Sequence, residues 1–218
     1  MARAGAGRRR VQPGGHPLRP EVVVHHQRQR IIAAAGRVIA ERGYRQVSVA
    51  DIVKAAAIAR GRFYEHFASK EDCFFALYDS AAEEALSAVR EACQAGEGEF
   101  PTRVGAGIAA LLSSIDADPE RARACVVEGP AVGPAIAPRF EKLIEDFAEI
   151  LRSGRGEALE GELPATVEET VVGGLYWLLY YALLEERPKK VVRMKPQLTE
   201  FSLIPFIGAG AAGVAATS

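Results

Sequence analysis

The sequence predicts an all-α protein of about nine helices, in which an N-terminal three-helix domain with a helix-turn-helix precedes a C-terminal helical domain. Apolar residues recur at helical spacing between Gly, Pro and Asp signals, and no run alternates as a strand would. Residues 48–70 have the pattern of two short helices joined by a tight turn. Charge also divides the chain, because residues 1–70 hold 14 Lys and Arg against 4 Asp and Glu, whereas residues 71–218 hold 13 against 24.

The N-terminal arm and the first helix differ in composition. Residues 1–21 are rich in Gly, Pro and Arg, a composition that buries too little apolar surface to fold, so we expect a flexible basic arm. A helix is predicted over residues 22–42, with Gly43 as its C-terminal stop. Its apolar face consists of Ile31, Ile32, Ala35, Val38 and Ile39.

Two short helices follow this stop. Ser48 is expected to cap the first of them, because Asp51 completes a capping box ahead of an apolar stripe. The stripe consists of Val49, Ile52, Val53 and Ala56. A turn at residues 56–58 then leads to a second helix, predicted over residues 59–67. The second helix has basic and aromatic side chains that suit contact with base edges and phosphates, namely Arg60, Arg62, Tyr64 and His66.

The division of charge supports contact with DNA. The first 70 residues carry a net charge of +10 and the remainder a net charge of −11. A basic first third attracts a polyanion, and counterion release would make the binding of DNA strongly dependent on salt. An accidental bias of a solvated surface is the alternative, but the basic segment coincides with the two-helix pattern. The basic arm could enter the minor groove, although a segment without a role explains its charge equally well.

Further helices are predicted along the rest of the chain. Ser69 is expected to cap a long helix whose first turn carries Glu71 and Asp72, a favourable place for negative charge. The later helices are expected at about residues 102–115, 118–128, 137–152, 164–186 and 197–207. The longest apolar run, residues 171–184, has 14 residues, which is too short to cross a bilayer and typical of a buried core helix. We therefore expect no contact with a membrane.

Other classes of protein have little support. Three widely spaced cysteines, Cys73, Cys93 and Cys125, indicate neither a disulfide framework nor a zinc site, which fits a reducing cytoplasm. The N-terminus lacks the apolar stretch of a signal peptide. Residues 105–110 and 208–213 match the dinucleotide fingerprint as letters, but neither follows a predicted strand. We expect no catalytic activity, no cofactor and no metal.

Four short motifs resemble the N-terminal signature of TetR-family transcriptional regulators. They are Gly43–Tyr44, residues 48–52 (SVADI), residues 60–67 (RGRFYEHF) and residues 69–71 (SKE). The resemblance covers about residues 22–80, and residues 126–130 (VVEGP) resemble a sixth-helix pattern found in some members. One departure is Ala57, where the family usually has Gly in the turn. Because Ala tolerates a positive φ poorly, we expect the turn to be slightly strained or rearranged.

The resemblance implies that residues 22–68 form the DNA-binding domain and that seven residues contact DNA. These residues are Ser48, Arg60, Gly61, Arg62, Tyr64, His66 and Lys70. The arginines would pair with guanine edges or phosphate, the glycine would keep the helix close to the groove, and the tyrosine and histidine would contact the sugar-phosphate backbone. The serine and the lysine would hold phosphates on either side. A plain capping role is the alternative for the serine, and a solvated surface for the others.

The resemblance also implies two functions for residues 69–218. The last two long helices would form a homodimer interface, with residues 171–184 and 201–207 as candidates, and a dimer would bind an inverted-repeat operator in double-stranded DNA. The other helices would surround a cavity for a small-molecule effector, which would release the regulator, a repressor, through a population shift. Candidate cavity walls are Phe140, Phe147, Tyr176, Trp177 and Tyr180.

Two alternatives concern this second domain. A well-packed core without a cavity would account for the same aromatic residues. A ligand-independent architectural DNA-binding protein would share the first 70 residues and would need no cavity. If an effector does bind, the nearly neutral candidate walls favour an apolar or aromatic molecule.

Overall fold

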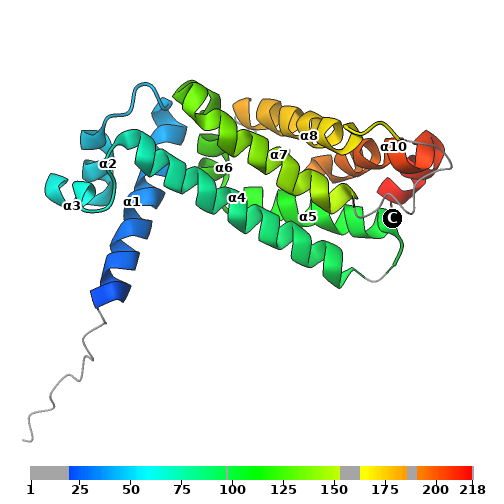
Figure 1. Ribbon diagram of the computed structural model, residues 1–218, viewed down its shortest axis with the longest axis horizontal. Helices are drawn as coiled ribbons and strands as arrows, with labels where there is room; N and C mark the ends of the chain where they lie inside the picture. Colours follow the sequence, from blue (N-terminus) through cyan, green and yellow to red (C-terminus); the bar gives the residue numbers. More distant parts are fainter. Residues whose placement is uncertain (1–19, 97, 153–162, 186–190, 218) are drawn as a thin grey trace, which may run out of the picture.

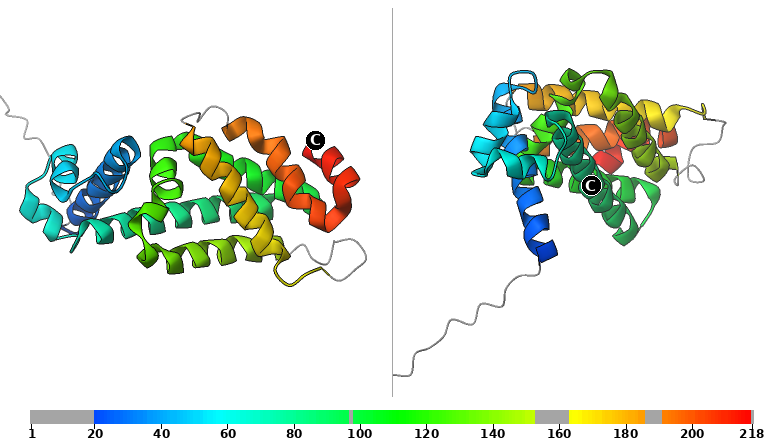
Figure 2. Two further views of the ribbon diagram at one scale, coloured as in Figure 1. Left: turned by 90° about the horizontal axis from the view of Figure 1, so that it is seen from above. Right: turned by 60° about the vertical axis from the view of Figure 1, so that its left-hand side comes forward.

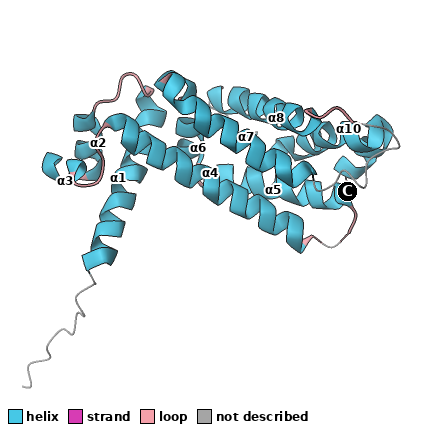
Figure 3. Ribbon diagram, viewed as in Figure 1, coloured by secondary structure: helices cyan, strands magenta, loops and turns pink. Residues whose placement is uncertain are grey.

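A computed structural model describes residues 20–96, 98–152, 163–185 and 191–217, and across these ranges the regular structure is entirely helical (Figure 3). The α-helices are α1 (Pro20–Arg42), α2 (Val49–Ala56), α3 (Arg60–Tyr64), α4 (Lys70–Ala95), α5 (Phe100–Ala117), α6 (Pro119–Val126), α7 (Ala137–Arg152), α8 (Val167–Leu184) and α10 (Lys195–Ala216). Short 3-10 turns lie at Gly129–Val132, Pro134–Ile136 and Val192–Met194. The predicted all-α fold is confirmed. The basic arm lies outside the described residues, apart from the first residues of α1.

The molecule is elongated, with α1–α3 at one end and a helical bundle behind them (Figure 1). Helix α4 starts beside α3 and runs along the bundle, where it packs against α5. Helices α7 and α8 pack on each other, and α10 packs on α5 and α8 (Figure 2). The short helix α6 contacts α1, α4 and α8, so it lies where the two ends of the molecule meet.

The apolar core at the N-terminal end of the molecule is shared between helices α1, α2 and α3 and the bundle. Phe63 and Ile52 are fully buried, and they belong to the same cluster as Phe74 and Leu77 of α4 and Ala124 of α6. A second cluster fills the bundle between α5, α7, α8 and α10. Helices α1, α2 and α3 therefore share one core with α4 and α6, and α1 packs on both of those helices.

The capping signals in the sequence are confirmed. The Ser48 side chain accepts a hydrogen bond from the backbone N–H of Asp51, and the Asp51 carboxylate accepts one from the Ser48 backbone N–H, which completes the capping box. Ser69 caps α4 in the same manner by accepting from the N–H of Asp72. Asp118 likewise caps α6 through the N–H of Arg121.

Several helix boundaries differ from the predictions by two or three residues, and the C-terminal ends of α3 and α10 differ for reasons that the fold supplies. Helix α3 ends at Tyr64 rather than at residue 67, because the chain tightens into a turn that brings both Phe63 and Phe67 into the core. Helix α10 continues past residue 207 to Ala216, with a break at Gly208 (φ 77°, ψ 159°). Within the longer segment Val192–Ala216, an 18-residue window has a mean hydropathy of 1.4, so the segment is long and apolar enough to cross a membrane by composition alone. Because the break at Gly208 leaves two pieces shorter than the roughly 20 residues that a span requires, this composition is weak evidence for a membrane.

The turn between α2 and α3 is strained but not rearranged. Ala57 has φ 51° and ψ 51°, the left-handed conformation that glycine usually adopts, and it is the one non-glycine residue with a positive φ in the described ranges. Its N–H donates to the Lys54 carbonyl at 3.2 Å, and the N–H of Ile58 donates to the Val53 carbonyl at 3.2 Å. These bonds hold the turn in a helix-ending conformation despite the alanine Cβ.

We expect Ala57→Gly to stabilise the protein by about 0.5–1 kcal/mol. Relief of left-handed strain, roughly 1–2 kcal/mol, outweighs the extra entropy of glycine in the unfolded chain, about 0.4–1 kcal/mol. The midpoint of urea unfolding measures the change. Ala55→Gly, inside α2, is the matched control and should destabilise by roughly 0.5–1 kcal/mol. A lower midpoint for Ala57→Gly would contradict the strain.

Candidate DNA-binding helix and effector cavity

Helix α3 presents an exposed cationic and aromatic face. Arg60, Arg62 and Tyr64 are all exposed, whereas Phe63 on the opposite face is fully buried and anchors the helix. The Arg60 guanidinium lies over the Tyr64 ring, with Cζ 5.8 Å from the ring centroid, and its Nη2 is 3.4 Å from the tyrosine hydroxyl. Arg62 Nη1 forms an ion pair with Glu65 at 2.7 Å. Both arginines are therefore solvent-accessible, and exposed pairs of this kind break at little cost.

Gly61 lies between these two arginines and faces open space. A Cβ built at this position would meet no atom within 4 Å. Its φ is not positive, so neither packing within the chain nor backbone conformation requires a glycine there. The missing side chain leaves room for a molecule outside the chain to approach the backbone of α3.

Ser48 is held in its capping role by both of its available protons. The backbone N–H donates to Asp51 Oδ2 at 2.9 Å and the hydroxyl donates to the same oxygen at 2.6 Å. These hydrogen bonds from Ser48, together with Arg42 at 3.0 Å from Asp51 Oδ1, hold the pKa of the Asp51 carboxyl below its usual value. Contact between Ser48 and a phosphate stays a prediction, and it would require these bonds to Asp51 to rearrange.

Lys70 is directed into the protein rather than toward solvent. Its Nζ donates to the carbonyls of Tyr44 and Val47, each at 2.9 Å, and lies 4.1 Å from the centroid of the Tyr44 ring. Burial lowers the pKa of the Lys70 ammonium. These contacts fix the corner between α1 and α2 to the start of α4. Contact between Lys70 and phosphate stays a prediction, and in this structure the ammonium is bonded to two backbone carbonyls.

His66 is half-buried at the end of α3. Its Nε2 atom is inaccessible and has no hydrogen-bond partner among the described residues. Of the seven residues predicted to contact DNA, the structure thus brings Arg60, Gly61, Arg62 and Tyr64 together on one exposed surface. Of the other three, Ser48 and Lys70 have their polar groups bonded within the protein, and the Nε2 atom of His66 is buried.

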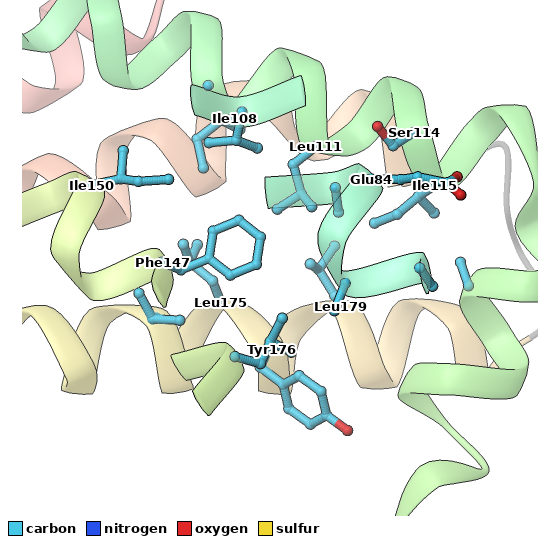
Figure 4. A pocket seen from close by; sticks show the side chains of 18 of the residues that line it. Glu84, Ile108, Leu111, Ser114, Ile115, Phe147, Ile150, Leu175, Tyr176 and Leu179 are labelled. Carbon is cyan, nitrogen blue, oxygen red and sulfur yellow. The ribbon is translucent and has the colours of Figure 1, made fainter. Parts of the chain in front are cut away.

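A cavity of about 400 Å³ lies among the bundle helices (Figure 4). Helices α4 to α8 supply nearly all of its wall, which is mainly aliphatic and includes Ile108, Leu111, Ile115, Leu175 and Leu179. Glu84 and Ser114 lie together near one end of the cavity in the close-up view. The size and the apolar wall are typical of a small-molecule site.

The structure separates the five predicted wall residues into two groups. Phe147 and Tyr176 line the cavity, although the Tyr176 hydroxyl turns away from it and donates to the Val126 carbonyl at 2.8 Å. Phe140 does not line the cavity and packs on the Tyr176 ring with centroids 4.8 Å apart. Trp177 and Tyr180 do not line the cavity either. Contact of an effector with Phe140, Trp177 and Tyr180 stays a prediction.

Most polar groups of the cavity wall already have partners within the protein. The Ser114 and Ser202 hydroxyls donate to the carbonyls of Ala110 and Leu198. Arg121 bonds to both carboxylate oxygens of Glu84, at 2.5 and 2.9 Å, and to the Ser80 hydroxyl at 2.9 Å. The wall therefore offers few free hydrogen-bonding groups. The Arg121–Glu84 pair could not be predicted from the sequence, because neither residue belongs to a pattern that marks it as part of a cavity.

The thiols of the cavity are in a protonated state that does not favour nucleophilic chemistry. Burial raises the pKa of Cys125 to about 12, and it also raises the pKa of Cys93. Both glycine-rich matches lie inside helices, residues 105–110 in α5 and residues 208–213 in α10, without the strand that a dinucleotide site requires. Among the described residues, no three His, Cys, Asp or Glu side chains are grouped as metal ligands.

Comparison with known proteins agrees with this architecture. Residues 31–77 match the family model of bacterial regulatory proteins of the tetR family. Over 145 residues the chain is 30% identical to the uncharacterized HTH-type transcriptional regulator YezE of Bacillus subtilis, a match that covers 61% of the chain and 72% of the relative. The chain belongs to the TetR family. It is a DNA-binding transcriptional regulator of the helix-turn-helix type.

Two further likenesses concern part of the sequence and the fold. The regulator is 29% identical over 124 residues to the HTH-type transcriptional regulator EthR of Mycolicibacterium smegmatis, which covers 57% of the chain and about half, 53%, of that relative. Its fold is similar to that of the transcriptional regulator FadR from Bacillus subtilis in complex with stearoyl-CoA, with a TM-score of 0.71 and 21% identity, covering 82% of the chain and 98% of the solved structure.

The outer faces of α8 and α10 in this regulator expose several large apolar side chains. Trp177 is 55% exposed and stacks on Tyr180 with ring centroids 5.5 Å apart and planes within 5° of parallel. Tyr181, Phe201 and Ile204 are also exposed. The two helices meet at Gly174, where a Cβ would lie 2.6 Å from the Phe201 ring. An apolar surface of this kind is typical of an interface with another protein.

We expect Lys70→Met to destabilise the regulator by about 1–3 kcal/mol, because it removes two charge-assisted hydrogen bonds and leaves the carbonyls of Tyr44 and Val47 without a donor. Urea unfolding measures the loss. Lys54→Met, at an exposed lysine of α2, is the control and should change the stability by less than about 0.5 kcal/mol. Equal unfolding midpoints for the two variants would contradict a stabilising role of the hydrogen bonds from Lys70.

Proposed function

We propose that this regulator binds an inverted-repeat operator as a homodimer, represses transcription and is released from DNA by an apolar effector in the bundle cavity. The observation that carries the proposal is the exposed cationic face of α3, which is anchored on a core shared with α4 and α6. Since both of those helices also line the cavity, an occupant could alter the placement of α3. The protein would act on DNA in the cytoplasm.

The proposed DNA contacts divide by role. Arg60 and Arg62 have exposed guanidinium groups that would exchange their surface contacts with Tyr64 and Glu65 for guanine or phosphate. Tyr64, 47% exposed, would contact the sugar-phosphate backbone. Gly61 would let the α3 backbone lie close to the groove, which explains a glycine that nothing inside the chain requires. Ser48 and Lys70 would act from the flanks, and His66 would act through the edge of its ring that remains accessible.

The exposed faces of α8 and α10 are the proposed dimer interface. Burial of Trp177, Tyr181, Phe201 and Ile204 against a second copy would remove these apolar side chains from water and give two α3 helices related by a twofold axis. Two half-sites in the operator then follow. Sedimentation equilibrium tests the interface: a dimer mass for the natural chain and a monomer mass for Trp177→Glu are expected, and a monomeric natural chain would exclude it.

The proposed effector has a long aliphatic part. The cavity wall is mainly apolar, and the hydroxyls of Ser114, Ser202 and Tyr176 are bonded to backbone carbonyls, so selection would rest mainly on shape and length. The Tyr78 hydroxyl is buried without a hydrogen-bond partner among the described residues. Polar groups concentrate at Glu84 and Arg121, where a polar head could remain near water. The FadR structure with stearoyl-CoA shows a protein of this fold with such a ligand, which makes acyl-CoA a reasonable first probe.

Replacement of both arginines should remove operator binding, whereas replacement of the glycine should weaken it without harming the fold. Fluorescence anisotropy with DNA from the upstream region of the gene, at several salt concentrations, measures the affinity. We expect Arg60→Ala with Arg62→Ala to reduce the affinity at least about tenfold and to flatten its dependence on salt.

Gly61→Ala separates the DNA contact from stability. Its Cβ meets no atom of the chain, so we expect unchanged or slightly higher stability, by up to about 1 kcal/mol, together with weaker operator binding. Lys54→Ala, on the adjacent helix, is the control for a loss of charge outside α3. If the glycine variant and the double arginine variant both bind as the natural chain does, α3 is not the recognition helix.

Thermal unfolding with acyl-CoA probes tests the effector class. Stearoyl-CoA at 100 times its dissociation constant should stabilise the regulator by about 2.7 kcal/mol, while free coenzyme A should not. Leu111→Trp, which places an indole in the cavity, should abolish the shift but retain a cooperative unfolding transition. If the protein binds its operator but no acyl-CoA of any chain length raises its unfolding temperature, the alternative of a ligand-independent architectural protein is favoured.

A further inference from the structure

Glu128 connects the cavity helix α6 to the corner between α1 and α2. Helix α6 ends two residues earlier, after contributing Arg121, Ala122, Cys125 and Val126 to the cavity wall. The Glu128 carboxylate, with only 18% of its side chain exposed, accepts the backbone N–H of Tyr44 through Oε2 at 2.9 Å. The bond joins positions 84 residues apart in the chain.

The carboxylate fits closely against this corner. Gly43 has φ 83°, and a Cβ at this position would lie 3.2 Å from Glu128 Oε2. On the other side, Arg123 Nη1 is 3.7 Å from Glu128 Oε1, so the carboxylate is also tied back to its own helix. Because the backbone and the carboxylate are in direct contact, a displacement of the end of α6 cannot leave the Tyr44 amide undisturbed.

The carbonyl and the ring of Tyr44 are in contact with residues of α4. Lys70 donates to the Tyr44 carbonyl, and the Tyr44 ring packs edge-on against Phe74 with centroids 5.2 Å apart. Tyr44 is thus held at its N–H by the residue after α6 and at its carbonyl and ring by α4. The chain runs from this corner directly to Ser48, which caps α2, and α2 packs against α3.

We propose that Glu128 is the positioning residue through which the state of the cavity sets the orientation of α2 and α3. A cavity occupant that shifts α6 relative to α4 changes the bond from Glu128 to Tyr44, while Lys70 keeps the other side of Tyr44 fixed to α4. The corner then tilts, and α3 tilts with it. The inference rests on the proposed function of the cavity and assigns its coupling to one hydrogen bond.

Exchange of the Tyr44 amide proton reports the bond without any ligand. In the full-length ¹⁵N-labelled protein, Glu128→Ala should raise the exchange rate of this amide about tenfold or more, and Glu128→Gln, which keeps an acceptor oxygen, should raise it less. The Ile58 amide, bonded to Val53, should keep its rate. Glu120→Ala, at an exposed carboxylate of α6, is the matched control and should leave the Tyr44 amide unchanged.

Cavity filling tests the coupling independently of the effector's identity. Leu111→Trp and Ala122→Leu place extra atoms in the cavity, and we expect at least one of them to raise exchange at Tyr44 and to reduce operator affinity about fivefold or more. In a Glu128→Ala background the same fillers should change operator affinity less than twofold. The proposal is overturned if the cavity-filling substitutions reduce operator affinity equally with and without Glu128. It is also overturned if neither substitution changes the exchange rate of the Tyr44 amide while Glu128 is present.

Stearoyl-CoA separates this proposal from the proposed effector class. If stearoyl-CoA binds the natural chain, Glu128→Ala should bind it with a dissociation constant within twofold of that of the natural chain, as judged from the thermal shift. The variant should, however, lose the decrease in operator affinity that stearoyl-CoA causes. A full decrease in the variant would overturn the coupling role. If stearoyl-CoA does not bind the natural chain, the acyl effector is wrong, and the cavity-filling pairs still decide the role of Glu128.

Discussion

The shared apolar core at the junction of α1, α4 and α6 is the constraint on which the rest of the structure depends. A three-helix unit this small buries little surface alone, and its core is completed by Phe74 and Leu77 from α4 and Ala124 from α6. The recognition helix α3 is five residues long and has Phe63 as its fully buried anchor. The position of α3 is therefore set by helices that lie outside the helix-turn-helix itself, and this shared packing gives the cavity a physical route to the DNA-binding surface.

Short-range structure follows from local signals that spacing in the sequence reveals. The capping box of Ser48 and Asp51, the cap at Ser69 and the strained Ala57 all involve residues within a few positions of one another, so spacing alone reveals them. The ends of helices were less predictable. Helix α3 stops early because Phe67 must also enter the core, a demand that comes from the tertiary fold and not from the local pattern.

The roles of individual site residues depended on long-range contacts that spacing does not reveal. Tyr176 and Trp177 are neighbours in sequence, yet one lines the cavity and the other faces outward, because successive residues of a helix point about 100° apart. Lys70 fits a phosphate-contact motif, but its ammonium is directed to carbonyls 23 and 26 residues away. Glu128 stood in a motif without an assigned role, and its partner lies 84 residues distant.

The distribution of polar groups explains how one small fold can combine tight structure with adjustable contacts. In the cavity wall, Ser114, Ser202 and Tyr176 are bonded to backbone carbonyls, so an apolar occupant leaves no buried hydroxyl of these residues unpaired. At the corner of α1 and α2, by contrast, the backbone N–H of Tyr44 is bonded to Glu128, just after α6, and its carbonyl is bonded to Lys70 of α4. Helix backbones satisfy their own hydrogen bonds and resist change, whereas this peptide depends on two charged side chains carried by separate helices. The proposed coupling therefore predicts that relative movement of α4 and α6 acts on DNA binding through Tyr44.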